Sequence, residues 1–486
     1  MRGFAPLLLL LLPACSAFIT VPGSLPPVPD ELLTRAFPPE DLAADLDELF
    51  AIIEEVHPDP YTVVPRDEVQ RRRAALIASL DRPLTRREFQ PRVAELVAAL
   101  GDAHTTIYLP WPDWWRHVAG PQGCFPIDVE WDGAALLVRR TAVVTEGGDL
   151  APGARLVEIA GEPADALFRR FMQRQSGESE AWRASSVESA FPVHVWVEGL
   201  APPWPLRFES AVEPGRVLSV SLPGLAWGAV ARGEAPAAGP AWRLQRRDDG
   251  AAVLAIDTLA GDLGEFEDFL EETFEALAAT PPRALVVDLR RNGGGDSRLG
   301  DELLQYVAHR PWRQASRKDW KMSDRYRAFF KSFLQPWLRW MPLQYLHPMG
   351  WDMWTTPTGE CLVLEEEMVE PRDEPLRWDG PLAWLIGPQT FSSAASLAVA
   401  VKDCGLGLLV GEPTGGQVNA FGEVYPFQLS RTRLGGQVSS ANFVRPNGDA
   451  SSRGGVEPDV LVRAAPGEPG DTVLEAAIAR LLGTLP

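Results

Sequence analysis

Two adjacent serines in the string LAWLIGPQTFSSAASLAVAVKDCG stand where nucleophilic chemistry is feasible. Ser392 and Ser393 follow a predicted strand and begin a predicted helix. The unsatisfied backbone N–H groups and the dipole of a helix N-terminus favour a developing negative charge, as in acyl transfer. Serine at this place is also a common N-cap, so the string alone leaves a catalytic and a structural interpretation open.

Two further strings carry polar chemistry at the ends of predicted elements. In ALVVDLRRNGGGDS, residues 284–297, a buried strand runs into three glycines, whose exposed N–H groups suit an oxyanion, although a tight turn explains the glycines equally well. In GDAHT, His104 is one of six histidines in the chain and follows a predicted helix. A histidine in a short polar turn is a candidate general base, whereas His57 is expected to close the first helix.

Together these strings resemble the S41 peptidase superfamily, which includes tail-specific proteases, tricorn-type proteases and the retinoid-binding repeats. The resemblance rests on the DLRxNxGG turn, TFSSA about 100 residues later, VGEPTGG, a final GVEPD, and LGDAHT upstream. It covers residues 40–118 and 250–463 and is clearest over 284–297 and 382–417. It implies that Ser392 is the nucleophile, with Ser393 as the alternative if the loop is one residue shorter. It also implies an oxyanion hole formed by the N–H groups of Gly294 and Ser393.

Departures from the family pattern change the expected base. Ser/Lys members carry a lysine shortly after the VGE strand, where this chain has Gln417, and glutamine cannot accept a proton from serine. The tricorn-like branch uses the histidine of the upstream string, which implies that His104 is the base. That branch orients its histidine with a glutamate, whereas this chain has Ser452 at the nearest position. Three acids are therefore candidates for the third member of the triad: Asp449, Glu423 and Asp102.

The elements that position these strings predict an α/β protein. Apolar residues at steps of three and four from Leu42, and a Thr85–Glu88 capping box, indicate N-terminal helices. Beyond residue 240, strands alternate with helices, which favours a mainly parallel sheet. The S41 resemblance implies that this sheet is of the ClpP/crotonase type. The predicted domains are a lipoprotein-type signal peptide (1–15), a tether (16–39), a helical domain with GDAHT (40–118), a β-rich PDZ-like domain (119–225), a linker (226–240), an S41-type catalytic domain (241–466) and a C-terminal helix (467–486).

Two segments allow more than one interpretation. The string LAPGARLVEIAG resembles part of a PDZ-like module, which binds peptide by strand addition, but a plain β linker domain fits nearly as well. Residues 311–354 are rich in Trp, Lys and Arg and fit neither a helical nor a strand period. We interpret them as an insertion near the site and a candidate lid.

The N-terminal sequence indicates where the protein is located, and the net charge indicates which partners are unsuitable. The apolar run Leu7–Leu12 is too short to span a bilayer but suits an export signal, and Leu12-Pro13-Ala14-Cys15 resembles a lipobox, which implies a lipidated Cys15. An ordinary cleaved signal is the alternative. We therefore expect a periplasmic or cell-surface lipoprotein that touches the membrane only through its N-terminus. The formal charge of −20 disfavours nucleic acid as a partner.

The sequence thus predicts an exported serine peptidase that cleaves peptides or unfolded protein tails through an acyl-enzyme. It lacks a GxSxG elbow and an HExxH motif, and we expect no metal or organic cofactor. Cys124, Cys361 and Cys404 are too widely spaced for a disulfide framework. The alternative function is a non-catalytic peptide- or ligand-binding protein on the same fold, as in the retinoid-binding repeats.

Overall fold

The computed structural model describes residues 25–143, 148–231, 240–346, 348–463 and 470–483. These residues form two compact units, each built from several chain segments. Unit 1 comprises 1–113, 317–365 and 421–443, and unit 2 comprises 114–316, 366–420 and 444–486. Because the units are discontinuous, they do not test the predicted domain boundaries. Cys15, residues 16–24 of the predicted tether and residues 232–239 of the predicted linker lie outside the described residues.

Unit 1 contains the predicted N-terminal helices. Apolar residues on one face of each helix form a shared core, and the predicted capping box at Thr85 and Glu88 is present. The main helices are α2 (Pro39–Val56), α3 (Arg66–Ala78) and α4 (Arg86–Ala98), preceded by the short α1 (Asp30–Leu33).

A sheet from distant parts of the sequence completes unit 1. Its strand order is β14-β13-β18-β17, and β3 pairs with β18. The strands are β3 (Thr106–Ile107), β13 (Arg317–Lys321), β14 (Cys361–Glu365), β17 (Ala420–Gln428) and β18 (Gly435–Val444). The buried Asp45 of α2 secures the β17–β18 turn, because its carboxylate accepts hydrogen bonds from the backbone of Arg431 at 2.9 Å and of Thr432 at 2.8 Å.

Unit 2 contains the predicted α/β sheet, with the order β10-β11-β12-β15-β16-β19. Only the β10–β11 pair is antiparallel. The strands are β10 (Trp242–Arg246), β11 (Ala251–Ile256), β12 (Ala284–Asp288), β15 (Leu382–Ile386), β16 (Leu408–Gly411) and β19 (Val460–Leu461). The prediction of a mainly parallel sheet is therefore confirmed.

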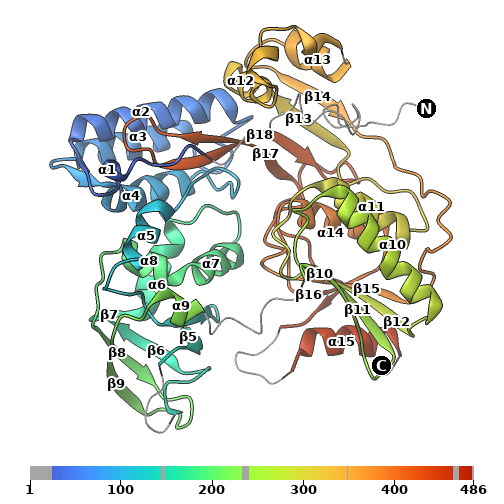
Figure 1. The fold of residues 1–486 in the computed structure, drawn as a ribbon, viewed down its shortest axis with the longest axis horizontal. Helices are drawn as coiled ribbons and strands as arrows, with labels where there is room; N and C mark the ends of the chain where they lie inside the picture. Colours follow the sequence, from blue (N-terminus) through green and yellow to red (C-terminus); the bar gives the residue numbers. More distant parts are fainter. Residues whose placement is uncertain (1–24, 144–147, 232–239, 347, 464–469, 484–486) are drawn as a thin grey trace. The chain divides into compact units, whose positions relative to one another are not determined.

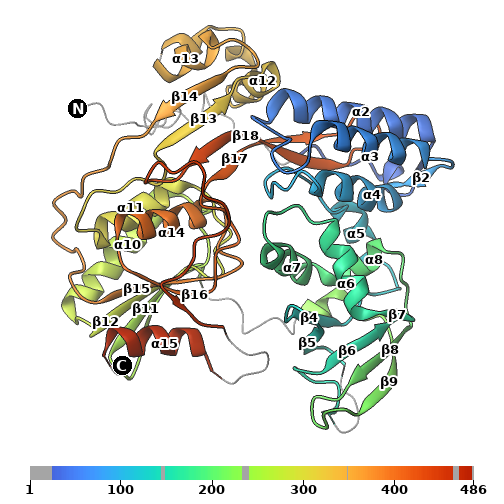
Figure 2. The same cartoon turned by 180° about the vertical axis from the view of Figure 1, so that it is seen from behind.

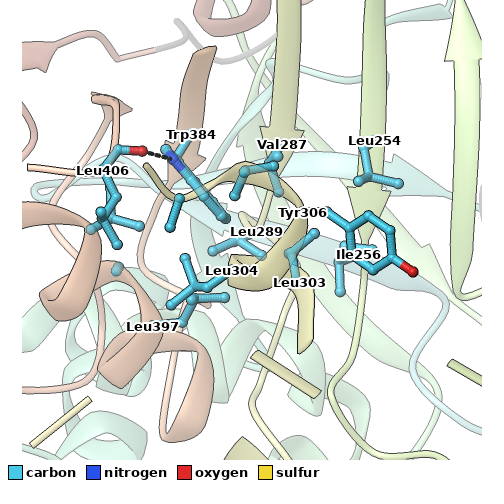
Figure 3. Packing of buried hydrophobic residues seen from close by; sticks show 14 of the residues in the cluster. Leu254, Ile256, Val287, Leu289, Leu303, Leu304, Tyr306, Trp384, Leu397 and Leu406 are labelled. Atoms are coloured by element: carbon cyan, nitrogen blue, oxygen red, sulfur yellow. Dashed lines mark hydrogen bonds between the residues drawn. The ribbon is translucent and has the colours of Figure 1, made fainter. Parts of the chain in front are cut away.

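Helices cover both faces of this sheet, as its apolar strands require. One face packs against α10 (Leu263–Ala279), α11 (Ser297–Val307) and α14 (Ser393–Cys404), and the other against α15 (Thr472–Leu481) (Figures 1 and 2). Side chains alternate between the faces, so that Val287 joins the first core and Val286 the second. In the first core, the buried Trp384 donates its indole N–H to the carbonyl of Leu406 at 3.2 Å (Figure 3).

The segment predicted to be β-rich also belongs to unit 2. It forms an antiparallel sheet with the order β4-β5-β6-β8-β9, and β7 pairs with β6. The strands are β4 (Ile127–Trp131), β5 (Leu136–Thr141), β6 (Arg155–Ile159), β7 (Glu162–Pro163), β8 (Trp204–Glu209) and β9 (Val217–Leu222). Helices that the sequence analysis did not predict pack on this sheet: α6 (Ala164–Gln173), α7 (Glu180–Ser189) and α8 (Phe191–Val197).

Candidate active site

Ser392 occupies a strained turn between β15 and α14. Its backbone angles, φ 52° and ψ −129°, lie outside the regions that residues with a side chain normally adopt. Among the described residues only Ala160, Glu423 and Arg433 also combine a side chain with a positive φ. Ser392 is the N-cap of α14, yet its side chain makes no capping hydrogen bond. The structural interpretation of this serine, an ordinary N-cap, therefore does not account for it.

Ser393 has a structural contact for its hydroxyl. Its Oγ donates a hydrogen bond of 2.7 Å to the carbonyl of Gly295, which ties the start of α14 to the glycine turn. The backbone nitrogen of Ser393 also faces this turn, since a Cβ added to Gly294 would lie 3.0 Å from it and 2.7 Å from the Cβ of Ser392. Glycine at position 294, with φ +99°, is thus what allows the two segments to meet.

The glycine turn is organised by the fully buried Asn292. The side-chain Nδ2 of Asn292 donates to the backbone carbonyl of Ile256 at 2.9 Å. The backbone carbonyl of Asn292 accepts the backbone N–H of Phe391 at 3.0 Å. Its side-chain oxygen accepts the backbone N–H of Gly294 at 2.9 Å. The predicted oxyanion donor Gly294 is therefore occupied in this conformation, which differs from the open N–H that the sequence analysis expected. The physical reason is the Asx turn that asparagine forms two residues before a glycine.

An aromatic pair supports the nucleophile turn. The rings of Phe391 and Trp182 stack with centroids 3.8 Å apart and planes 15° apart. Trp182 belongs to α7, and its indole N–H donates to the carbonyl of Ser176 at 3.2 Å. A Cβ at Gly415 would lie 2.8 Å from the Trp182 ring, so the glycine of the VGEPTGG string makes room for it. No local sequence pattern indicates this role for Trp182, because the contact joins distant segments.

His104 lies in unit 1, in the turn after α4, and is 8% exposed. Burial lowers the pKa of its imidazole below the ordinary value, and the nearby Asp102 carboxylate partly opposes that shift. One carboxylate oxygen of Asp102 accepts the backbone N–H of His104 at 2.9 Å. The other accepts the Ser439 hydroxyl at 2.7 Å and contacts His57 Nε2 at 3.1 Å.

His57 helps to keep the carboxylate of Asp102 ionised. Its Nδ1 accepts the backbone N–H of Asp59 at 3.1 Å, so Nε2 carries the proton and donates to Asp102. Burial is the largest single influence and would raise the pKa of the Asp102 carboxyl, but the hydrogen bond and charge of His57, together with His104 and Thr105, hold the pKa well below its usual range. His57 also closes α2 as its C-cap, as predicted. An ionised carboxylate is therefore buried in the same turn as His104.

The other two candidate acids have different partners. Asp449, in unit 2, accepts the hydroxyls of Ser451 and Ser452, which lower its pKa to about 2. Glu423, in β17, forms an ion pair with Lys318. The backbone of Gln417 pairs with Gly455 in an isolated bridge. Of the three acids, only Asp102 has a described contact with the His104 turn.

Comparison with known proteins decides the family. The model of peptidase family S41 matches residues 251–462, which hold the glycine turn, both serines and Gln417. This part of the chain belongs to peptidase family S41. The chain is accordingly a serine-type peptidase, a hydrolase. No curated protein matches the sequence.

Solved structures share the fold of this chain over most of its length. Mature CPAF complexed with lactacystin is 16% identical, with a TM-score of 0.61, and the match covers 92% of this chain and 97% of that one. The CPAF S499A mutant is 15% identical, with a TM-score of 0.61 and coverage of 92% and 96%. At this identity the likeness shows the fold alone.

Other features of the described residues bear on cofactors and location. No cluster of acidic, histidine or cysteine side chains there has the makings of a metal site, and Cys124, Cys361 and Cys404 carry free thiols. None of the helices among these residues is both long and apolar enough to cross a bilayer.

Proposed function

We propose that this S41 peptidase cleaves peptides or unfolded protein tails through an acyl-enzyme on Ser392, with His104 as general base. The observation that carries the proposal is the backbone of Ser392. A side-chain-bearing residue at φ 52° and ψ −129° is costly, and such strain persists where it serves a function. The same strand-to-helix geometry presents the nucleophile in unrelated serine hydrolases.

In the proposed reaction, neutral His104 takes the proton of Ser392 as Oγ attacks the substrate carbonyl. The tetrahedral oxyanion accepts the backbone N–H of Ser393, at the start of α14. Gly294 adds a second donor when its N–H shifts from the Asn292 side chain toward the oxyanion. The protonated His104 then gives its proton to the leaving amine, and a water molecule hydrolyses the acyl-enzyme by the same route in reverse.

Asp102 is the best supported of the three candidates for the third member of the triad. Its buried negative charge lies in the His104 turn and favours the imidazolium that forms during the reaction. Its described hydrogen bond reaches the backbone of His104, so we assign it an electrostatic and positioning role. Asp449 and Glu423 engage other residues and are weaker candidates.

We further propose that the protein is exported and anchored by a lipid on Cys15. The support is the short apolar run followed by Leu-Pro-Ala-Cys at the N-terminus. The proposed location is therefore the cell surface or the periplasm.

Labelling with a fluorophosphonate probe tests the nucleophile, with the modified peptide identified by mass spectrometry. Ser392→Ala should abolish labelling and lower kcat/KM for peptide cleavage by at least about 10⁴-fold. Ser393→Ala is the matched control: it removes the hydrogen bond to Gly295 but keeps the backbone N–H, so labelling should persist. Labelling that is lost only in Ser393→Ala would move the nucleophile by one residue. A wild type that neither labels nor cleaves would favour the binding-protein alternative.

A further inference from the structure

Unit 1 exposes five large apolar side chains within fifteen residues of sequence. They are Trp337 (56% exposed), Trp340 (80%), Tyr345 (40%), Leu346 (80%) and Trp351 (54%), which we call the aromatic patch. Tryptophan is normally among the more buried residues, and a concentration of exposed large apolar side chains marks an interaction site. The patch belongs to the segment between β13 and β14.

The patch is not left over from an incomplete core. The helices α12 (Asp324–Ser332) and α13 (Pro348–Thr355) have a core of their own, in which Tyr326 and Met353 are buried together with Trp320 of β13. Phe329, Phe330 and Trp354 pack against the same cluster, and both views show these helices beside β13 and β14 (Figures 1 and 2). The segment thus divides its aromatic residues between an inner set that packs and an outer set that faces solvent.

The segment between β13 and β14 holds four Arg or Lys against three Asp or Glu, in contrast to the acidic excess of the chain. Two of the cations, Arg325 and Arg327, are paired with acids. From Arg325 to Trp351 there is no Asp or Glu, although the whole chain holds 66 acidic residues. The exposed Arg339 donates to the backbone carbonyls of Leu334 and Ser332, both at 2.9 Å, so these bonds leave its charge unneutralised. The ammonium of Lys331 lies 5.6 Å from the centre of the Trp354 ring, a contact that also preserves its charge.

We propose that the aromatic patch docks on an anionic phospholipid surface. Tryptophan and tyrosine favour the headgroup level of a bilayer, because one part of each ring is apolar and another can hydrogen-bond. The exposed Leu346 adds a side chain suited to the acyl boundary, and Arg339 and Lys331 suit lipid phosphates. Trp337 lies in the 3-10 helix η3 (Pro336–Leu338), and Tyr345 and Leu346 lie in η4 (Leu343–Leu346). Trp351 belongs to α13, and its ring centroid lies 5.3 Å from that of Tyr345.

A second copy of the chain is a less suitable occupant. A two-fold interface would place the same patch on both sides, so Arg339 and Lys331 would face their own copies. The flanking acids are Asp324, which pairs with Arg327, and Asp352, so the interface would bring together more cations than acids. An anionic lipid surface supplies the missing negative charge at every position. The proposal does not depend on the peptidase mechanism and can fail independently of it.

Vesicle flotation of the full chain tests the proposal, in a Cys15→Ser background that removes any N-terminal lipid. The protein should float with vesicles of mixed phosphatidylglycerol and phosphatidylcholine. The triple variant Trp337→Ser/Trp340→Ser/Trp351→Ser should reduce partitioning at least about tenfold, because less apolar area enters the interface. The double variant Trp111→Ser/Trp115→Ser, at tryptophans exposed by 37% and 49% elsewhere, is the matched control and should bind like its parent.

A charge variant gives a second readout if the triple variant fails to fold. Arg339→Gln should reduce binding to mixed vesicles about fivefold and leave binding to pure phosphatidylcholine unchanged. Equal flotation of the parent and the triple variant, or no flotation of the parent, overturns the proposal. So does light scattering that shows a dimeric parent and a monomeric triple variant, because a second copy then occupies the patch.

Discussion

At the scale of single residues, the adjacent serines divide two tasks that the sequence could not separate. Ser392 holds the strained backbone and makes no capping bond, whereas Ser393 gives its hydroxyl to Gly295 and leaves its N–H near the nucleophile. The glycine turn is ordered by the side chain of Asn292. The Asn292 side chain accepts the Gly294 N–H, so in the proposed mechanism this N–H would have to leave that bond to reach the oxyanion.

The pH dependence of kcat/KM follows from the burial of His104. General-base catalysis needs the neutral imidazole, and burial lowers the pKa of His104. Activity should therefore rise with pH through an apparent pKa below the ordinary value of about 6.5 and be fully developed at neutral pH. Asp102→Asn removes the charge that opposes the effect of burial, so the acid limb should move to lower pH while kcat falls.

Two variants separate this mechanism from its rivals. His104→Ala should lower kcat/KM by about 10²–10⁴-fold or more, toward the level of Ser392→Ala. Gln417→Ala, at the position of the family's lysine, should change kcat/KM far less. If His104→Ala kept most of the wild-type rate while Ser392→Ala was inactive, the base would have to be another group.

The sequence could predict those residues whose function depends on local order along the chain. Ser392, His104 and the glycine turn stand at the ends of predicted elements, and their strings resemble those of a known family. The bond from His57 to Asp102 joins residues 45 positions apart, and the Asp102–Ser439 bond spans 337. No pattern of local periodicity encodes such contacts, so the buried cluster around His104 required the structure.

At the scale of elements, α7 is the helix that packs on the nucleophile turn. Trp182 stacks on Phe391, the residue immediately before Ser392, and fills the space left by Gly415. The prediction for this region was a β-rich domain, based on short apolar runs between Gly and Pro, and it did not include α7. The helices and strands of residues 241–466 were predictable. The helices repeat apolar residues at helical steps, and the strands are uniformly apolar.

Truncation of Trp182 should lower kcat more than it raises KM. Trp182→Ala removes the ring that limits the movement of Phe391, and the strained Ser392 backbone can then relax. We expect a loss of stability on the order of 1–3 kcal/mol for this half-buried ring and a kcat reduced at least about tenfold. Trp182→Phe keeps a stacked ring and should restore most of kcat. Thermal unfolding and steady-state kinetics measure both effects, and a Trp182→Ala enzyme with wild-type kcat would contradict the positioning role.

At the scale of the whole molecule, the sequence could not predict that each compact unit is built from several separate chain segments. Unit 1 takes segments 317–365 and 421–443 from far along the chain to complete the sheet beside its N-terminal helices. Residues 311–354, interpreted from the sequence as an insertion and a candidate lid, contribute β13 to that sheet, and α12 and α13 pack on it. Long-range pairing of this kind depends on loop closure over hundreds of residues, which local propensity does not report.

The net charge of −20 restricts how the protein can meet an anionic membrane. Charges farther apart than about 8–10 Å are largely screened at physiological salt, so a local cationic and aromatic surface can bind lipid while the rest of the chain is acidic. The aromatic patch fits this requirement, but reversible contacts of this kind are weak alone. Stable anchoring needs a second signal, which the proposed lipid on Cys15 would supply.

Metabolic labelling with a fatty-acid analogue tests that second signal. The wild type should incorporate the label and fractionate with membranes, and Cys15→Ser should lose the label, because the thiol is the site of acylation. Cys124→Ser, at a buried free cysteine, is the matched control and should label like the wild type. If the two signals cooperate, Cys15→Ser should retain weak, salt-sensitive membrane association, which Trp337→Ser/Trp340→Ser/Trp351→Ser in the same chain abolishes. Equal labelling of the wild type and Cys15→Ser, or none in either, would leave the aromatic patch as the remaining proposed membrane contact and exclude the lipid anchor.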